Sequence, residues 1–360
     1  MQKLFYELIL VALGQKERLF KNPSDQEWSA MYDMAEKQAV AGIAFLALDK
    51  LSQVGQKPPL ALLYEWIGLS EQTRNQNQIV NQRCKDITRL FADAGFHSCI
   101  LKGQGNAMMY PEPSVRTSGD IDIWIDAPRN EIRDFVTSRC QDCQDGDMHI
   151  DFPIYKDVPI EVHYTPRVDV RPKYNKRLQQ WIIDHKEEQF SHTVALSHED
   201  TESICVPTLE FSLVQQMSHI MGHFFVEGIG LRQFIDYYYL LKNPDLKVDK
   251  EDINKTFRCL GLEKFAKGVM WIEQQILGLQ DEYLIIEPNE WIGKVIQKEM
   301  EEGGNFGHHD QRYAVRSKGI LMRGLVDSYR LLKLAYYFPE DALWKLWNKI
   351  ENQKWKLKSH

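Results

Sequence analysis

The chain has 360 residues and a formal net charge of −7, with 43% hydrophobic and 26% charged residues. This balance is typical of a folded globular protein, because chains that stay disordered carry fewer apolar residues. The negative charge provides no broad cationic field, so duplex DNA is not expected as a partner.

The sequence contains no run of about 18 apolar residues, the minimum for a spanning helix, so no membrane span is expected. Charges at Glu7 and Lys16 bracket the apolar run near the N-terminus, and no small-residue cleavage site follows it, which indicates a helix rather than a signal peptide. The single CxxC, Cys140 to Cys143, has no second pair with which to form a zinc ribbon. We therefore expect a cytoplasmic protein with free thiols.

Apolar residues at helical spacing mark residues 1–92, which we assign to an N-terminal helical region of two to four helices. The end of this region is rich in glutamine and asparagine. Apolar positions recur there between polar ones: Ile79, Ile87, Leu90 and Phe91. This pattern predicts one long helix with a narrow buried stripe.

The pattern changes after Gly95. A strand is predicted at residues 97–101, a helix at 103–110, a strand at 120–125 and a helix at 129–140. Two short apolar segments on either side of Lys156-Asp157 then predict an antiparallel hairpin. This order implies a small mixed sheet, and we assign it to a core region at residues 93–165.

From Leu209 onward the pattern is helical again. We assign residues 166–360 to a C-terminal helical region that forms the other wall of a cleft, because a small sheet cannot enclose a ligand alone. The predicted fold class is α+β, with a small mixed sheet flanked by N-terminal and C-terminal helical regions.

The most informative segment is residues 101–125. Asp120 and Asp122 are two apart on a predicted strand, so their carboxylates point to the same side and form an oxygen site that suits Mg²⁺. Upstream, Gly103 and Gly105 open a helix directly after a strand, where backbone N–H groups can approach phosphate oxygens and Lys102 can add a positive charge. Together these features favour a metal-dependent phosphate site over a solvated strand.

This segment resembles the polymerase-β-type nucleotidyltransferase superfamily, and within it the bacterial family of uncharacterised nucleotidyltransferases. The shared residues are Leu101-Lys102-Gly103, Tyr110-Pro111, Arg116 and Gly119-Asp120-Ile121-Asp122. Gln104 stands where the superfamily usually has serine or a second glycine. A looser likeness extends to His219, Arg232, Asp236 and Gly304-Asn305-Phe306-Gly307.

The resemblance implies transfer of a nucleoside monophosphate from an NTP to an acceptor that it does not identify. Asp120 and Asp122 would be catalytic ligands of Mg²⁺ or Mn²⁺, with nucleotide contacts from Lys102, Gly103, Gly105, Arg116 and Gly119. The superfamily's third carboxylate lies on a later strand, where Glu161 is the best match. A cross-strand ion pair is the alternative for Glu161, and Asp151 is the rival third acid.

For several other residues the sequence is compatible with two different roles. His219 and His223, four apart on a helix, either share a metal ion or are buried and hydrogen-bonded. Arg232 either pairs with Asp236 along its helix or contacts the triphosphate, and we include it among the nucleotide contacts. A basic cluster could be a solvated face or an acceptor site: Arg312, Arg316, Lys318, Arg323 and Arg330.

Two other functions also remain open. One is a phosphotransferase that uses the same metal site, and the other is a catalytically inactive nucleotide-binding or scaffold protein.

Overall fold

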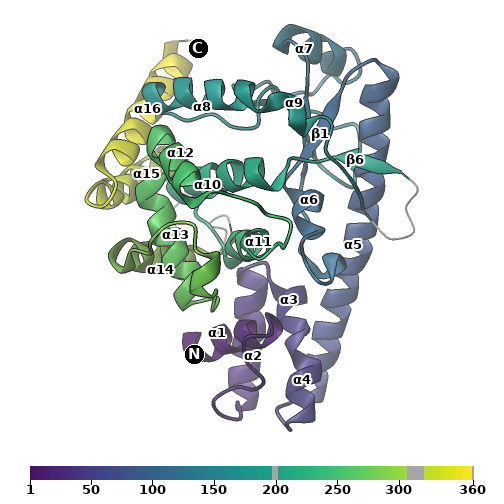
Figure 1. The fold of residues 1–360 in the computed structure, drawn as a ribbon, viewed down its shortest axis with the longest axis vertical. Coiled ribbons are helices and arrows are strands. Elements are labelled where there is room, and N and C mark those ends of the chain that lie inside the picture. Colours follow the sequence, from purple (N-terminus) through teal and green to yellow (C-terminus); the bar gives the residue numbers. More distant parts are fainter. Residues whose placement is uncertain (197–201, 306–319, 359–360) are drawn as a thin grey trace.

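The computed structural model describes residues 1–196, 202–305 and 320–358. It has the predicted α+β fold, with a small mixed sheet between N-terminal and C-terminal helices (Figure 1). Some residues with predicted roles lie outside the described ranges: Phe306, Gly307, Arg312, Arg316 and Lys318. Within those ranges, no helix has the length and apolar character needed to cross a bilayer.

Residues 1–93 form five helices, which is more than the two to four predicted. They are α1 (Gln2–Ala12), α2 (Asp25–Lys37), α3 (Ala41–Phe45), α4 (Ala47–Gln53) and α5 (Leu60–Asp93). Only Leu46 separates α3 from α4, and these helices have five and seven residues. Such short helices make too few turns to show a periodic pattern in the sequence.

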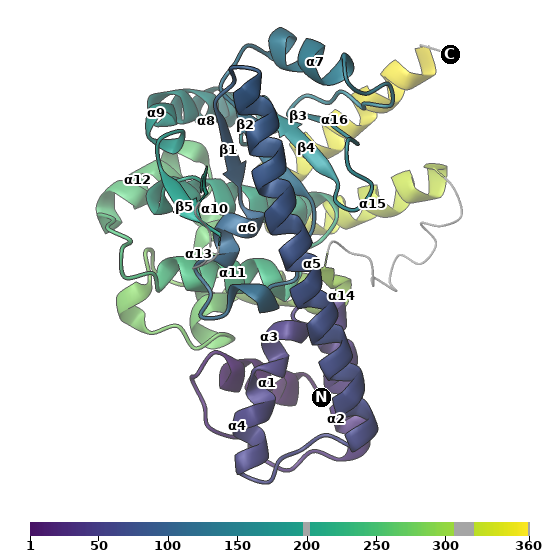
Figure 2. The same ribbon diagram turned by 90° about the vertical axis from the view of Figure 1, so that its right-hand side faces the viewer.

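Helix α5 has 34 residues and is therefore about 50 Å long. Its N-terminal half packs on the other N-terminal helices, and its C-terminal half crosses one face of the sheet (Figure 2). The stripe that faces the sheet is Val80, Cys84, Ile87 and Phe91. The predicted stripe was wrong at Ile79, which is 39% exposed, because the neighbouring Val80 occupies the buried position.

The sheet has the strand order β1-β2-β4-β3. Its strands are β1 (Ser98–Leu101), β2 (Ile121–Ile125), β4 (Ile160–His163) and β3 (His149–Asp151). Strand β2 is antiparallel to β1 and parallel to β4, and β3 and β4 form the predicted antiparallel hairpin. In this register Asp122 lies beside Glu161.

The two faces of β2 pack against different parts of the molecule. Ile121, Ile123 and Ile125 lie in the core formed with α5 and α7 (Arg129–Thr137). Trp124 points the other way, and its ring packs against the rings of Phe190 and Phe211. Because side chains alternate along a strand, Asp122 shares the Trp124 face and is directed toward the C-terminal helices.

The remaining elements run from the sheet to the C-terminal helices. They are α6 (Gly103–Ala107), η1 (Pro113–Val115), α8 (Pro172–Asp184), α9 (Lys186–Gln189), β5 (Thr193–Ala195), β6 (Ser203–Cys205), α10 (Leu209–Val226), α11 (Leu231–Leu241), α12 (Lys250–Leu260), α13 (Glu263–Gln275), η2 (Asp281–Tyr283), α14 (Glu290–Gly303), α15 (Ile320–Ala335) and α16 (Pro339–Lys358). The β5-β6 hairpin was not predicted, and β6 packs against β1 and α5.

Buried apolar side chains of the described chain form two clusters. One lies between the isoleucine face of the sheet and α5. The other is shared by the N-terminal and C-terminal helices. Gln38 illustrates this sharing, because its side chain accepts a hydrogen bond from the Leu231 N–H and donates one to the Met300 carbonyl. The boundaries given above to the three regions remain a proposal.

Candidate active site

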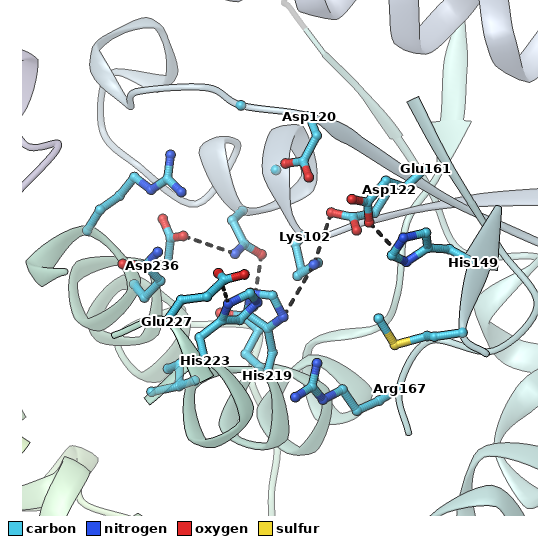
Figure 3. A pocket seen from close by; sticks show the side chains of 18 of the residues that line it. Lys102, Asp120, Asp122, His149, Glu161, Arg167, His219, His223, Glu227 and Asp236 are labelled. Carbon is cyan, nitrogen blue, oxygen red and sulfur yellow. Dashed lines mark hydrogen bonds and ion pairs between the residues drawn. The ribbon is translucent and has the colours of Figure 1, made fainter. Parts of the chain in front are cut away.

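A sharp turn joins β1 to α6 and carries Lys102. This residue has φ 51° and ψ −138°, and Gly103 follows with φ 43°. Positive φ at a non-glycine residue is strained, on the order of 1–3 kcal/mol, and persists where the surroundings enforce it. The turn directs Lys102 into a cavity of about 230 Å³ between the sheet and helices α10 and α11 (Figure 3). Helix α6 ends at Ala107 and is shorter than predicted.

Three carboxylates meet at this cavity. Asp120, Asp122 and Glu161 each offer an oxygen, and these atoms all lie within 4.8 Å of one another. Asp151 lies opposite Glu161 on the edge strand, one strand farther from β2, and does not belong to the group. The convergence predicted from the sequence is therefore present with Glu161 as the third acid, while the catalytic roles of these residues remain a proposal.

The side chains of Lys102 and His163 hold Asp122. The Lys102 Nζ atom lies 3.0 Å from one carboxylate oxygen of Asp122, and the His163 Nε2 atom lies 2.7 Å from the other. Burial would raise the pKa of Asp122, but Lys102 and His163 outweigh it and hold the pKa below its usual value. Burial likewise lowers the pKa of His163, whereas its hydrogen bonds to Asp122 and Glu161 raise it, with a net increase. Asp122 is thus fixed as an oriented carboxylate.

Asp120 has a different environment. Its side chain is more exposed than that of Asp122 and makes none of these contacts. Repulsion by Asp122, followed by burial, raises the pKa of Asp120 to about 6. The two neighbouring carboxylates therefore differ in pKa, and Asp120 gains most from a cation placed between them.

Helix α10 forms the opposite wall and presents two histidines. The His219 Nδ1 atom lies 3.3 Å from Lys102 Nζ, and the rings of His219 and His223 are 4.3 Å apart (Figure 3). Burial lowers the pKa of both, so both imidazoles are neutral at pH 7. Neither histidine belongs to a three-ligand group within the described ranges, so a metal shared by this pair has no third ligand there.

Arg116 forms a buried ion pair with Asp236 of α11. The Arg116 Nε and Nη2 atoms donate to the two Asp236 oxygens at 2.7 and 2.8 Å, and the Tyr110 hydroxyl adds a third hydrogen bond at 2.6 Å. Arg232 donates to the Thr117 carbonyl at 2.8 Å. These contacts attach α11 to the segment that leads into β2. Both arginines line the cavity, and their contact with a nucleotide remains a prediction.

The glycines and Gln104 lie in different places. Gly103 and Gly119 line the cavity, whereas Gly105 does not. Gly105 faces Val206 instead, since a Cβ atom added at Gly105 would lie 3.2 Å from the Val206 side chain. Gln104 points away from the cavity and donates hydrogen bonds to Asn77 and Asn81 of α5. In this chain the residue at the position usually held by serine therefore attaches the turn between β1 and α6 to helix α5.

Sequence reasoning did not select all the residues that line the cavity. His163 could have been selected, since it is two residues from Glu161 and shares its strand face. His149, Gln216 and Arg167 also line the cavity, but no sequence pattern marks them. Arg167 lies in an irregular segment after β4, where neither helical nor strand periodicity applies.

Comparison with protein families gives one match. A family model described as uncharacterised nucleotidyltransferase matches residues 24–278, well over half of the chain. The chain belongs to this family. The matched range includes the whole four-stranded sheet and the two helices, α10 and α11, that complete the cavity. No curated protein and no solved structure matches the chain.

Proposed function

We propose that this protein transfers a nucleoside monophosphate from an NTP to an acceptor, with the chemistry of the polymerase-β-type superfamily. The observation that carries the proposal is the convergence at one cavity of Asp122 on β2, Asp120 immediately before β2, and Glu161 on β4. The same cavity brings cationic groups close to these acids, which is the charge arrangement that a metal-bound triphosphate requires.

The donor set fits a hard divalent cation such as Mg²⁺ or Mn²⁺, because three carboxylates offer oxygen ligands only. When bound there, such cations lower the pKa of the attacking hydroxyl and neutralise the leaving pyrophosphate. The protein's own contribution is orientation. Lys102 and His163 fix the Asp122 carboxylate from two sides, so this ligand needs little rearrangement when a cation arrives.

Lys102 is the first nucleotide contact in this proposal. Its ammonium has two acceptors, Asp122 and His219, and therefore has a third N–H available for a phosphate oxygen. Gly103, Arg116, Gly119 and Arg232 are the other contacts that line the cavity, while Gly105 acts by letting α6 approach Val206. Helices α10 and α11 exclude water and select the acceptor.

Labelled NTPs test this proposal. The purified protein, with Mg²⁺ or Mn²⁺ and a cell extract as the source of acceptors, is incubated with each NTP carrying ³²P at the α or the γ position. Transfer of the α label by the wild type and not by Asp120→Asn supports nucleotidyl transfer. Transfer of the γ label identifies a phosphotransferase instead. Absence of both transfers, with calorimetry detecting no NTP binding, rejects the proposal and favours a scaffold role.

A further inference from the structure

Arg167 is an arginine of the cavity whose guanidinium has no hydrogen bond or ion pair within the described part of the chain. Its Nε atom is shut off from solvent and has no acceptor among the residues that the structure describes. By contrast, Arg116 is bound to Asp236, and Arg232 donates to Thr117. The backbone of Arg167 is held in place, since its carbonyl accepts a hydrogen bond of 2.7 Å from Gln179 of α8.

The acids whose charge acts on Arg167 are Asp169, Asp122 and Glu227, and each has another partner, which for Glu227 is His223. Asp169, two residues along the chain, is bound through both carboxylate oxygens by Arg171. Asp122 is held by Lys102 and His163. Burial lowers the pKa of Arg167, and burial together with Arg167 lowers the pKa of Lys345 on α16 to about 8. A desolvated cation without a partner is unfavourable, so this position suits an anion that comes from outside the chain.

Helix α10 has a glycine, Gly222, at the point where the Arg167 guanidinium contacts it. A Cβ atom added at Gly222 would lie 1.4 Å from Arg167 Nη2 and 2.6 Å from its Cζ atom. Only glycine therefore leaves room for the guanidinium in its present position. Glycine is among the least favourable residues in a helix interior, so its presence in the middle of α10 is explained by the space it leaves.

The position of Arg167 indicates which phosphates it would meet. Asp120 and Arg167 lie on opposite sides of Lys102, with Arg167 directed toward α10 (Figure 3). The phosphate that reacts would lie next to the three carboxylates, because these residues would hold the cation that assists the reaction. The rest of a triphosphate would then extend past Lys102 toward α10.

We propose that Arg167, in the space left by Gly222, binds the outer phosphates of the triphosphate, the part that leaves as pyrophosphate. This assignment rests on the proposed function for the identity of the ligand. Its basis is the guanidinium, which has no partner in the described part of the chain, and the glycine that accommodates it. The planar guanidinium can donate two parallel hydrogen bonds to a phosphate, which a lysine cannot do.

Calorimetric titration of the full chain in Mg²⁺ tests the assignment. The ligands are inorganic tripolyphosphate, the four NTPs, and the monophosphate of the NTP that binds best. For Arg167→Met we expect affinity for tripolyphosphate and NTP to fall about 10- to 100-fold, the value of a hydrogen-bonded charged group. Affinity for the monophosphate should not change. Arg167→Lys should show a smaller loss, and Arg133→Met, at an exposed position on α7, should show none.

A second variant moves the guanidinium without removing it. Gly222→Ala places a methyl group where Arg167 lies and should reduce affinity for tripolyphosphate as Arg167→Met does. Gly68→Ala on α5 is the matched control, because nothing lies within 4 Å of a Cβ atom there. In the absence of ligand, Arg167→Met should melt at the wild-type temperature or higher, whereas an arginine that only supports the fold would lower the melting temperature when replaced.

The outcomes separate the two proposals. If the wild type binds NTP and both Arg167→Met and Gly222→Ala bind it equally well, the role of Arg167 is wrong and the proposed function stands. If the wild type binds tripolyphosphate through Arg167 but transfers no label from any NTP, the anion site stands and the proposed function fails. If the wild type binds neither tripolyphosphate nor NTP, both are wrong.

Discussion

Asp120 immediately precedes β2 and Asp122 lies within it, and of these two acids Asp122 has Lys102 and His163 as partners. Asp120 adds a second negative charge beside it, which a cation would compensate. Substitution of each by asparagine therefore has different consequences for stability.

For Asp120→Asn we expect loss of transfer activity together with an unchanged or higher free energy of unfolding, because the change removes a repulsion. For Asp122→Asn we expect the free energy of unfolding to fall by about 3 kcal/mol, because Lys102 and His163 lose a buried charged partner. Urea unfolding of both variants in metal-free buffer measures this difference. Equal destabilisation by the two substitutions would contradict the asymmetry between the two sites.

Cation binding should depend on pH through Asp120. Its pKa of about 6 means that a proton occupies the carboxylate below that pH and competes with the cation. Affinity for Mn²⁺ should therefore rise up to about tenfold per pH unit between pH 5 and 6, and level off above pH 7. Free Mn²⁺ can be followed by electron paramagnetic resonance. Asp120→Asn should bind weakly with no such rise, and a pH-independent affinity in the wild type would contradict the role of Asp120.

The sequence identified candidate site residues where residue types suited to metal binding occur at the spacing of a strand. The spacing of Asp120 and Asp122 on an alternating strand identified both residues, and Glu161 followed from its strand position. Arg116 was selected as a phosphate contact, but the structure shows its ion pair with Asp236, 120 residues away in the sequence. Arg167 and Gly222 were missed, because their relation is a contact between a loop and a helix that no local pattern encodes.

At the scale of single elements, α13 carries a buried acid. Glu273 is fully buried, and within the described ranges neither of its carboxylate oxygens has a hydrogen-bond partner. Burial raises its pKa well above the usual value, so the carboxyl group is protonated in the folded chain at pH values where it ionises in the unfolded chain. The folded state then binds more protons, and stability decreases as pH rises above about 4.5, the unfolded value.

Glu273→Met should remove this dependence. In the wild type, Glu273 alone should lower the free energy of unfolding by up to about 1.4 kcal/mol per pH unit above the unfolded pKa. The variant should be more stable at pH 8, and its advantage should shrink toward pH 4. Urea titrations at several pH values measure both curves. Glu282→Met, at an exposed position, is the control, and an advantage of Glu273→Met that does not vary with pH would show that the acid does not titrate as described.

Element length decided which parts of the fold could be predicted. Strand β2 and the β3-β4 hairpin were found because apolar residues alternate within them and a turn joins β3 to β4. The three-residue strands β5 and β6 offer too few positions for alternation to be visible. The end of α6 was misplaced because Pro111 sets only the latest point at which that helix can stop.

At the scale of the whole molecule, α5 joins parts that the sequence suggested were separate. One end contributes Trp66 to the core shared with the other helices, and the other end covers the isoleucine face of the sheet. Deleting residues 1–92 would remove this cover and expose Ile121, Ile123 and Ile125. The sheet therefore depends on a helix that precedes it in the chain.

We expect a fragment of residues 93–360 to lack a cooperative thermal transition and to bind the dye ANS, because the exposed face of the sheet is apolar. Circular dichroism and dye fluorescence of the fragment and the full chain provide the comparison. A fragment that melts cooperatively and does not bind ANS would show that the core region folds by itself.

The contact between Gly222 and Arg167 also limits how relatives can diverge. Any larger residue at the glycine position collides with the arginine, whereas glycine without the arginine leaves an empty space in the helix surface. The two positions, 55 residues apart in the sequence, should therefore change together across the family. Relatives without an arginine at the position of Arg167 should have alanine or a larger residue at the position of Gly222. In such relatives we expect other residues to bind the outer phosphates.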